Sequence, residues 1–237
     1  MKAVILAGGR GTRLAPYTTV LPKPLMPIGD VPILEIVLRQ LASHGYQDVT
    51  LAVGHLAELL MAYFGDGAKY GLTIRYSRED NPLGTAGPLA LVTGLNSTFL
   101  VMNGDLLTTL NYTEFLRFHQ QRGAIATLAV YQRDVRIDLG VIETDSNGWA
   151  TDYREKPTYH FSVSTGIYLF EPAVLKHIVP RQRLDLPELI LHLIQSGEKV
   201  NCYRFGGDWL DIGRHDDYEL AVRQFEAHRE KFLPSQP

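Results

Sequence analysis

The sequence has almost no cysteine and no excess of either charge, and both shortages restrict where it works and what it binds. A single cysteine, Cys202, cannot form an internal disulfide, which is consistent with a reducing compartment. The formal net charge of the 237 residues is -3, so no overall positive field attracts nucleic acid or an acidic membrane surface. We therefore expect a cytoplasmic protein without nucleic-acid or membrane partners, in which Cys202 packs inside the core.

Long apolar runs, repeats and linkers are also missing. No stretch approaches the roughly 20 apolar residues of a membrane-spanning helix, and the apolar part of MKAVILAGG is too short for a secretory signal. No internal repeat, heptad pattern or low-complexity segment divides the chain. Because 45% of the residues are hydrophobic, residues 1–237 are expected to form a single domain around its own core.

What the first half does contain is an alternation of apolar runs with helical patterns, which is typical of parallel sheets. The alternation predicts an α/β fold with a mostly parallel central sheet and helices on both faces. The expected strands are 3–7, 49–53, 72–76, 99–102 and 124–131, and the expected helices are 33–41, 56–64, 85–95 and 112–121.

The second half is richer in strand patterns. The pattern ends in one amphipathic helix from 216 to about 231, after which the tail 232–237 is expected to fray. The other expected strands are 139–143, 150–154, 163–170, 200–205 and 209–212, with helices at 172–178 and 187–195.

Glycines and basic residues gather in LAGGRGTR, directly after the first expected strand. Gly8, Gly9 and Gly11 let the backbone come close enough to aim N–H groups at phosphate oxygens. Arg13 can bind an anion bidentately, and Lys23 adds a point charge. A glycine turn alone would indicate packing as readily as binding, but the basic residues favour phosphate. Neither G-x-x-x-x-G-K-[ST] nor G-x-G-x-x-G is present, so this is not a familiar nucleotide fingerprint.

The longer stretch LAGGRGTRLAPYTTVLPKPLMPI resembles the signature of the sugar-1-phosphate nucleotidylyltransferases, also called nucleotide-sugar pyrophosphorylases. The resemblance implies a single-domain, Rossmann-like nucleotide-diphospho-sugar transferase fold. PLGTAGPLAL is similar in particular to the mannose-1-phosphate guanylyltransferases. The further motifs are PLGTAGPLAL (82–91), VMNGD (101–105), LGVIE (139–143), REKP (154–157), STGIYLFEP (164–172) and WLDIG (209–213).

The resemblance implies where a nucleoside triphosphate binds. Arg13 would hold the triphosphate and stabilise the leaving pyrophosphate, and Lys23 would contact the α-phosphate region. With Asp105 they form the implied catalytic set. The implied nucleotide-binding set is Leu6, Ala7, Gly8, Gly9, Gly11, Thr12, Arg13, Lys23, Gly84 and Asp105.

Asp105 and Asp211 are the Mg²⁺ ligands that the resemblance implies. Two carboxylates, together with phosphate oxygens and water, form a suitable hard-oxygen site for Mg²⁺. An aspartate after a strand is more often a helix cap or a turn former. Spacing alone does not show that the two residues meet, and that step rests on the family pattern.

The sugar phosphate is implied to bind Gly140, Glu155, Lys156, Ser164 and Gly166. Glu155 would accept hydrogen bonds from sugar hydroxyls, Lys156 would pair with the phosphate, and Gly140 would leave room for the ring. Outside this context Glu155 and Lys156 would be an ordinary surface pair. Many family members have Asn where this chain has Ser164, which changes the hydrogen bonds available to a sugar hydroxyl.

The function implied is Mg²⁺-dependent transfer of a nucleotidyl group, most readily from GTP, to mannose 1-phosphate or a related hexose or heptose 1-phosphate. UTP, dTTP or CTP stay open as donors, as does a regulatory subunit that binds a nucleotide-sugar without catalysis. The glycine spacing disfavours a nicotinamide-dependent oxidoreductase. Hexapeptide repeats are absent, so we expect no C-terminal β-helix. We expect a monomer or a small homo-oligomer.

Overall fold

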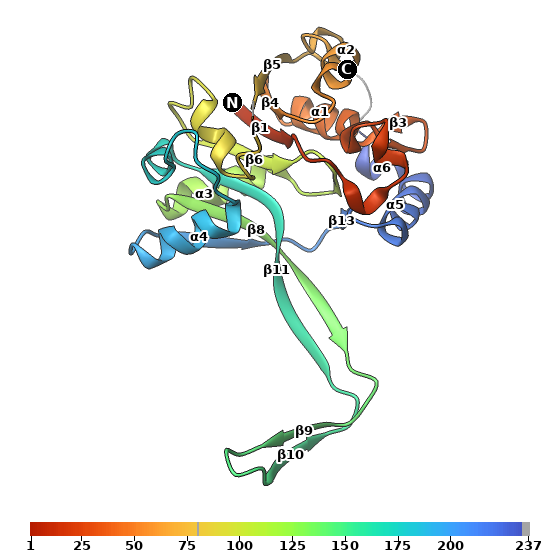
Figure 1. The fold of residues 1–237 in the computed structure, drawn as a ribbon, viewed down its shortest axis with the longest axis vertical. Coiled ribbons are helices and arrows are strands. Elements are labelled where there is room, and N and C mark those ends of the chain that lie inside the picture. Colours follow the sequence, from red (N-terminus) through yellow and green to blue (C-terminus); the bar gives the residue numbers. More distant parts are fainter. Residues whose placement is uncertain (80, 234–237) are drawn as a thin grey trace.

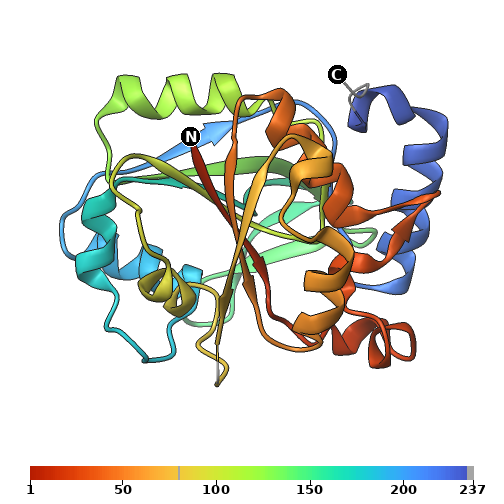
Figure 2. The same cartoon turned by 90° about the horizontal axis from the view of Figure 1, so that it is seen from above.

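The computed structural model, which describes residues 1–79 and 81–233, has a seven-stranded sheet at its centre (Figures 1 and 2). The strand order is β12-β8-β11-β6-β1-β4-β5. β11 runs antiparallel to β6 and β8, and the other pairings in the sheet are parallel, which confirms the predicted architecture. The strands are β1 (Lys2–Ala7), β4 (Asp48–Val53), β5 (Thr73–Arg78), β6 (Phe99–Asn103), β8 (Ala126–Arg136), β11 (Thr158–Phe170) and β12 (Val200–Arg204).

Helices cover both faces of this sheet, because alternate strand residues enter two separate apolar clusters (Figure 2). Ile5 of β1 belongs to the cluster that packs under α1, α2 and α3, whereas Val4 belongs to the cluster under α4. None of the helices in the described residues is long and apolar enough to cross a bilayer. The helices are α1 (Ile33–Ser43), α2 (Ala57–Phe64), α3 (Tyr112–Arg122), α4 (Leu186–Gln195), α5 (His215–Ala227) and α6 (Arg229–Phe232).

A third apolar cluster joins the C-terminal helices to the segments around the first loop. Phe225 of α5 and Phe232 of α6 are fully buried there beside Leu14 and Ile212. The cluster also contains residues of two short ribbons, β2 (Pro27–Ile28) with β3 (Val31–Pro32), and β7 (Leu106–Thr108) with β13 (Trp209–Asp211). It lies under the loop that follows β1 and supports that loop from below.

The C-terminal predictions need two corrections. The single helix expected from 216 to about 231 is interrupted at His228, which separates α5 from α6. Phe232 does not fray, because its ring is buried and its carbonyl accepts a hydrogen bond of 2.7 Å from Gln40 Nε2. Leu233 N donates to Arg229 O at 2.8 Å, and residues 234–237 of the expected tail lie outside the described residues.

Three further predictions are wrong, two of them drawn from periodicity. The helix expected at 85–95 is a short 3₁₀ helix, η5 (Gly87–Leu91), since the loop before it bonds elsewhere: the N–H groups of Ala86 and Gly87 both donate to Leu184 O. The segment expected as a helix at 172–178 is likewise a 3₁₀ helix, η6 (Pro172–His177). Cys202 is exposed rather than packed, because it lies on β12, an edge strand of the sheet.

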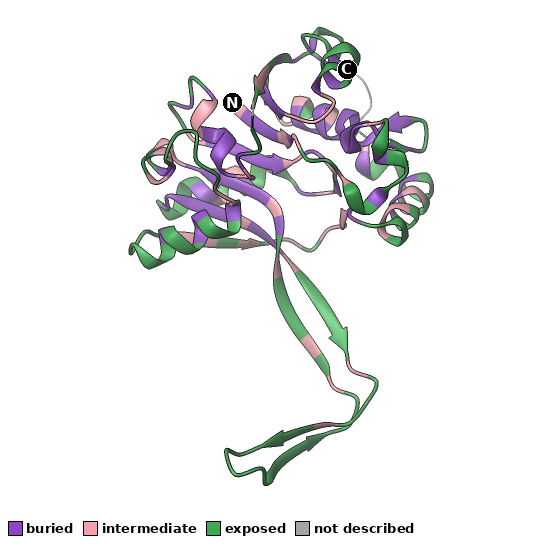
Figure 3. Ribbon diagram, in the orientation of Figure 1, coloured by how far each residue is buried: buried purple, intermediate pink, exposed green. Residues whose placement is uncertain are grey.

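Two strands leave the sheet as a long ribbon, which we call the arm (residues 131–163; Figure 1). β8 and β11 stay paired without a break from Val130 opposite Ser164 to Arg136 opposite Thr158. β9 (Val141–Thr144) and β10 (Ala150–Arg154) form a hairpin at its end. No residue of the arm is buried (Figure 3). The strands at 124–131 and 163–170 were predicted, but their continuation into an arm was not.

Candidate active site

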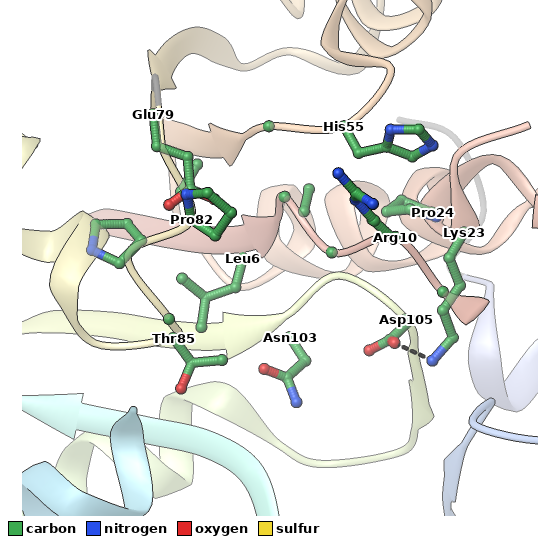
Figure 4. A pocket seen from close by; sticks show the side chains of 18 of the residues that line it. Leu6, Arg10, Lys23, Pro24, His55, Glu79, Pro82, Thr85, Asn103 and Asp105 are labelled. Carbon is green, nitrogen blue, oxygen red and sulfur yellow. Dashed lines mark hydrogen bonds and ion pairs between the residues drawn. The ribbon is translucent and has the colours of Figure 1, made fainter. Parts of the chain in front are cut away.

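A cavity of about 830 Å³ opens at the edge of the sheet where β1, β4, β5 and β6 end (Figure 4). These four strands are mutually parallel, so their carboxyl ends meet at one edge, where open α/β sheets bind ligands. The complete nucleotide-binding set predicted from the sequence lines this cavity. It is lined by Leu6 to Arg13 as one stretch, with Lys23, Gly54, His55, Glu79, Gly84 and Asp105 among the residues that join them.

The loop after β1 folds tightly against Lys23, and this requires glycine at position 11. Gly11 has a φ of 62°, and a Cβ there would lie 3.0 Å from Thr18 Cγ2 and 3.3 Å from Lys23 Cβ. Thr18 Oγ1 donates to Gly11 O at 2.8 Å and holds the turn. The glycine pattern therefore brings the loop backbone and the Lys23 side chain to the same wall.

Lys23 is a buried cation between two carboxylates. Its Nζ donates to Asp105 Oδ2, and it lies 3.8 Å from Asp211 Oδ1. The Lys23 side chain is only 10% exposed, so it depends on these carboxylates to offset the loss of water. The chain at Lys23 forms the short 3₁₀ helix η3 (Lys23–Leu25), which directs Nζ towards the end of β6.

Asp105 and Asp211 meet because β7 pairs antiparallel with β13. This ribbon places Asp211 opposite Leu106, and Ile212 N donates to Asp105 O at 3.3 Å. Burial raises the pKa of Asp211 above its usual value, and the nearby Asp105 carboxylate raises it further. Asp105 Oδ1 is buried without a hydrogen-bond partner among the described residues. The two carboxylates therefore lie close together, and one oxygen of Asp105 is an acceptor without a partner among the described residues.

Arg13 is a second cation near Asp211. Its guanidinium lies beside Gly213, where a Cβ would be 3.3 Å from a terminal nitrogen of Arg13. The positive charge of Arg13 opposes the increase in the pKa of Asp211, which places the two groups within electrostatic reach. Arg13 and Lys23 thus flank the end of β13 from two separate segments of the first loop.

The other end of the cavity is formed by residues that follow β5. Figure 4 shows Glu79, Pro82 and Thr85 at the end of the cavity opposite the pair formed by Lys23 and Asp105. Glu79 Oε2 accepts the Leu83 N–H at 2.9 Å. Glu79 Oε1 lies over Gly8, where a Cβ would come within 2.7 Å of it. A carboxylate oxygen therefore faces this end of the cavity.

Thr85 connects that wall to α4. Its Oγ1 accepts the Leu186 N–H at 2.7 Å, and its N–H donates to Asp185 Oδ1 at 2.9 Å. The Thr85 hydroxyl thus accepts the first N–H group of α4, which has no partner within the helix. The Asp185 carboxylate accepts the N–H group of Thr85 in the cavity wall. Gly84 lies directly against Leu184 O, where a Cβ would come within 2.6 Å of that oxygen.

Several lining residues were missed by reasoning from the sequence. All of them except Thr85 share one signal that could have found them, since they lie at the carboxyl end of a strand in the sheet or within about three residues of it. The missed residues are His55, Arg78, Glu79, Asn81, Thr85, Asn103 and Arg10. Arg10 lies in the glycine loop but was not part of the predicted set.

The predicted sugar-phosphate set is not brought together in the chain. Ser164 and Gly166 lie where the arm joins the sheet, and a Cβ on Gly166 would be 2.6 Å from Asn103 Nδ2. Gly140 precedes β9, and Glu155 and Lys156 follow β10, so all three are in the arm and none lines the cavity (Figure 1). The predicted set thus falls into two groups, because the ladder between β8 and β11 carries Gly140, Glu155 and Lys156 outwards with the arm.

The described residues contain no group of three or more His, Cys, Asp or Glu side chains suited to a metal. A metal at this edge of the sheet would therefore depend on Asp105 and Asp211 together with oxygen atoms from a ligand and water. The unused Asp105 Oδ1 and the hard-oxygen character of both carboxylates fit a cation such as Mg²⁺.

Known proteins are similar to this chain over nearly its whole length. A UTP–glucose-1-phosphate uridylyltransferase of Synechocystis sp. is 38% identical, in an alignment that covers 94% of this chain and 63% of the relative. A mannose-1-phosphate guanyltransferase of Schizosaccharomyces pombe is 34% identical over 99% of this chain and 67% of the relative. The chain therefore spans about two thirds of the length of these relatives.

A solved structure with a similar fold and a family model also match this chain. The crystal structure of HddC from Yersinia pseudotuberculosis superimposes with a TM-score of 0.73 at 23% identity, covering 94% of this chain and 99% of that chain, which supports the fold. The family model described as "Nucleotidyl transferase" matches residues 2–228, a span that includes the glycine loop, both carboxylates and the arm. The chain is accordingly a member of the nucleotidyl transferase family.

Proposed function

We propose that the chain transfers a nucleotidyl group from a nucleoside triphosphate to a sugar 1-phosphate, forming a nucleotide-sugar and pyrophosphate. The observation that carries the proposal is the placement of Lys23 and Arg13 beside Asp105 and Asp211 at one end of a cavity walled by a glycine loop. Membership of the nucleotidyl transferase family, and relatives named for uridylyl and guanylyl transfer, support this reaction class.

The chemistry explains why cations must cluster here. A phosphate oxygen of the sugar phosphate attacks the α-phosphorus of a triphosphate, so two anions must come into bonding range. At about 4 Å and an effective dielectric constant of about 20, each unscreened pair of like charges costs about 4 kcal/mol. Lys23 and Arg13 offset this repulsion, and Arg13 stabilises the pyrophosphate as it leaves.

The two ends of the cavity orient the nucleotide. Backbone N–H groups of the glycine loop, with Thr12, face the phosphates at the end that holds Lys23 and Asp105. The base then lies at the opposite end, between Glu79, Pro82 and Thr85 (Figure 4). This orientation leaves the α-phosphate near Lys23, where the attacking oxygen arrives.

Asp105 and Asp211 are the residues that would hold Mg²⁺. When bound, the ion would neutralise charge on the triphosphate oxygens and hold them in position. Lys23 pairs with both carboxylates in the chain and keeps them close together. Lys23 can turn to a phosphate oxygen once the carboxylates have another cation.

Guanine is the base that the far end of the cavity favours. Its N1–H and N2–H groups form an edge with two donors, whereas uracil and thymine offer one N–H. The Glu79 carboxylate at that end is an acceptor, and its Oε1 faces the loop at Gly8. We therefore propose GTP as the preferred donor. The relative named as a mannose-1-phosphate guanyltransferase supports mannose 1-phosphate, or a related hexose or heptose 1-phosphate, as the acceptor.

Pyrophosphate release tests the proposal directly. GTP, UTP, dTTP, CTP and ATP are each combined with mannose, glucose and heptose 1-phosphates in the presence of Mg²⁺. Release with GTP and one of the sugar phosphates is the expected result. Preferred release with UTP would reject the guanine assignment but keep the reaction class. Binding of a nucleotide-sugar without release from any pair would indicate a regulatory subunit instead.

A further inference from the structure

The end of the cavity opposite Lys23 is walled by a segment with little regular structure of its own. We call this segment, residues 82–88, the far wall. It consists of a loop and the start of the short 3₁₀ helix η5, whose hydrogen-bond geometry is poorer than that of an α-helix. The position of the far wall therefore depends on contacts from outside the segment. Its residues that line the cavity are Pro82, Gly84, Thr85 and Pro88.

The loop before α4 holds the far wall through backbone contacts. The N–H groups of Ala86 and Gly87 donate to Leu184 O at 2.8 and 3.0 Å. In the other direction, Leu184 N donates to Leu83 O at 3.0 Å. Gly84 has a φ of 77°, and a Cβ there would lie 2.6 Å from Leu184 O, so the two backbones touch at this point. The far wall and the loop before α4 thus form one connected unit.

Asp185 adds a charged contact to these backbone bonds. Its Oδ1 accepts the Thr85 N–H at 2.9 Å, and the Thr85 hydroxyl donates to the same oxygen at 3.3 Å. Thr85 Oγ1 in turn accepts the Leu186 N–H. Figure 4 shows the Thr85 methyl group on the side of Asn103 and the hydroxyl turned away from it. Because a charged acceptor forms the stronger hydrogen bond, Asp185 fixes which face of Thr85 meets the cavity.

Asp185 is itself held in place by α4. Its N–H donates to Glu188 Oε2 at 3.0 Å, in a capping box at the start of the helix. Leu186 and Leu189 anchor that helix, since both are buried in the apolar cluster that also contains Ala86 of the far wall. A site supported by a packed helix is placed more precisely than one supported by a loop alone.

Two carboxylates therefore hold the far wall, and they lie in different places relative to the cavity. Glu79, which lines the cavity, accepts the Leu83 N–H at 2.9 Å. Asp185 is not among the described residues that line the cavity, although it binds Thr85, which is. Any effect of Asp185 on a bound molecule is thus transmitted through the far wall.

We propose that Asp185 is a positioning residue for nucleotide selection: through Thr85 it sets the distance between the far wall and Glu79, and so the fit of the base between them. The nature of the ligand rests on the proposed function, whereas the link from Asp185 to the far wall rests on the geometry. A misplacement of about 1 Å can cost on the order of 100-fold in rate, and polar groups left unpaired decide between similar ligands. Asp185 therefore governs nucleotide binding and leaves sugar-phosphate binding unaffected.

Kinetics of three variants separate this role from simple support of α4. Asp185→Ala removes the acceptor for Thr85, whereas Asp185→Asn keeps an acceptor oxygen of the same shape. Glu188→Ala is the matched control, because it removes a capping bond from the same helix end without contact with Thr85. We expect Asp185→Ala to raise KM for GTP about 10-fold, to reduce the preference for GTP over UTP, and to leave KM for the sugar phosphate unchanged.

The other two variants decide what the increase in KM means. Asp185→Asn should retain a KM for GTP close to that of the wild type, and Glu188→Ala should change neither KM. Equal effects of Asp185→Ala and Glu188→Ala would show that only the stability of α4 is involved and would reject the positioning role. An unchanged KM for GTP in Asp185→Ala would reject it as well.

Amide hydrogen exchange tests the link without any need for activity. The Leu186 N–H is bonded to Thr85 Oγ1, so a nucleotide that steadies the far wall should also protect this amide. We expect GTP with Mg²⁺ to slow exchange at Leu186 by about 10-fold in the wild type and in Asp185→Asn. In Asp185→Ala this protection should be lost. Amides of α3, which packs on the opposite face of the sheet, are the internal control.

The two measurements distinguish failure of this role from failure of the proposed function. A wild type that releases no pyrophosphate, but in which GTP protects Leu186, rejects the function and keeps the role of Asp185. Protection by UTP alone rejects the guanine assignment and likewise keeps that role. An active wild type in which neither nucleotide protects Leu186 rejects the role of Asp185 and keeps the function.

Discussion

Lys23 lies between Asp105 and Asp211, and the charges of these three residues depend on one another. Removing one partner of a buried charge pair leaves the other charge uncompensated, which is more costly than losing an exposed pair. Lys23 nevertheless faces two carboxylates, so the loss of one negative charge leaves it a second. A neutral residue at one of the two acidic positions should therefore leave the fold intact, because Lys23 keeps one carboxylate partner. The same change removes a negative charge that a metal ion would need.

We expect Asp105→Asn to lower the rate of pyrophosphate release by at least 100-fold, in line with the loss of a group that stabilises charge in a transition state. The midpoint of thermal unfolding should change by only a few degrees, because Asn has the same shape and Asp211 still faces Lys23. Steady-state kinetics and thermal scans measure the two effects, with Glu226→Gln on the exposed face of α5 as the control. Turnover close to that of the wild type would contradict the role of Asp105.

The raised pKa of Asp211 predicts how stability depends on pH. Because the native pKa lies above the usual value of 3.8, the folded state holds its proton at pH values where the unfolded state has lost it. Stability in the absence of divalent cations should therefore fall as the pH rises from about 3.8 through the native pKa. Asp211→Asn lacks this titration and should gain stability relative to the wild type above that window.

Urea unfolding with a chelator at pH 4 and pH 7 measures this difference. The gain from Asp211→Asn should be larger at pH 7 than at pH 4. An equal effect at both pH values would show that Asp211 titrates normally in the folded chain.

Glu79 provides a test of the base preference. Glu79→Gln replaces a charged acceptor with an amide, and a hydrogen bond to a charged group contributes about 1.5–3 kcal/mol. We expect kcat/KM for GTP to fall by about 10- to 100-fold and that for UTP to fall less, since uracil offers a single donor. Equal losses for both nucleotides would place the base elsewhere in the cavity.

The residues of the glycine loop could be located from the sequence because their function is local. Gly11 and Arg13 belong to one short stretch, and the strand before them fixes which edge of the sheet they occupy. Glu79 and Asn103 carry no such motif, and only their positions at the ends of strands relate them to the cavity. A single glutamate after a strand is common, so its role is visible only in three dimensions.

At the scale of elements, the ribbon of β7 and β13 shows that periodicity does not reveal which strands pair. Both strands are short, and neither sequence says which partner it pairs with, yet their pairing places Asp211 beside Asp105. The helix expected at 85–95 fails for a similar reason, since the turn before it is held by Leu184 O from a distant loop. The central strands were predicted well because they are buried on both faces and read as continuous apolar runs.

The packing of α5 under the first loop should couple stability to activity. Phe225 is fully buried in the cluster that contains Leu14 and Ile212, the neighbours of Arg13 and Asp211 in the chain. Phe225→Ala should cost about 3–5 kcal/mol of unfolding free energy because it leaves a cavity. It should also lower kcat through movement of the flanking charged residues.

Denaturant unfolding and steady-state kinetics provide the two measurements. Glu226→Ala, on the exposed side of the same helix, should change neither value appreciably. A large loss of stability with unchanged kcat would show that the cluster supports the fold without positioning the site.

At the scale of the whole molecule, the chain combines a fully packed body with an arm that has no buried residue. The sequence predicted the body, because apolar alternation reflects burial. It did not predict the arm, because exposed strand residues such as those at 132–136 look like an ordinary polar loop. The part of β8 and β11 that lies in the arm is held by backbone pairing between the two strands. Backbone pairing does not produce a hydrophobic pattern in the sequence.

Ligand binding should stabilise the whole body, since the cavity joins four strands of the central sheet. At a GTP concentration of 100 times Kd, the expected gain is about 2.7 kcal/mol, or ~5–10 °C in Tm for a chain of this size. Thermal scans with Mg²⁺ and with a chelator should differ for the wild type. The same pair of scans should coincide for Asp105→Asn, and a persistent difference there would place the metal elsewhere.

The pairing of β7 with β13 also fixes the order in which the protein becomes complete on the ribosome. Synthesis delivers the glycine loop and Lys23 first, Asp105 near the middle and Asp211 close to the end of the described chain. Lys23 must therefore wait with one acidic neighbour, or with none, until β13 has emerged. A nascent chain that stops before β13 holds Lys23 with one of its two carboxylate partners, whatever the state of the sheet beneath it.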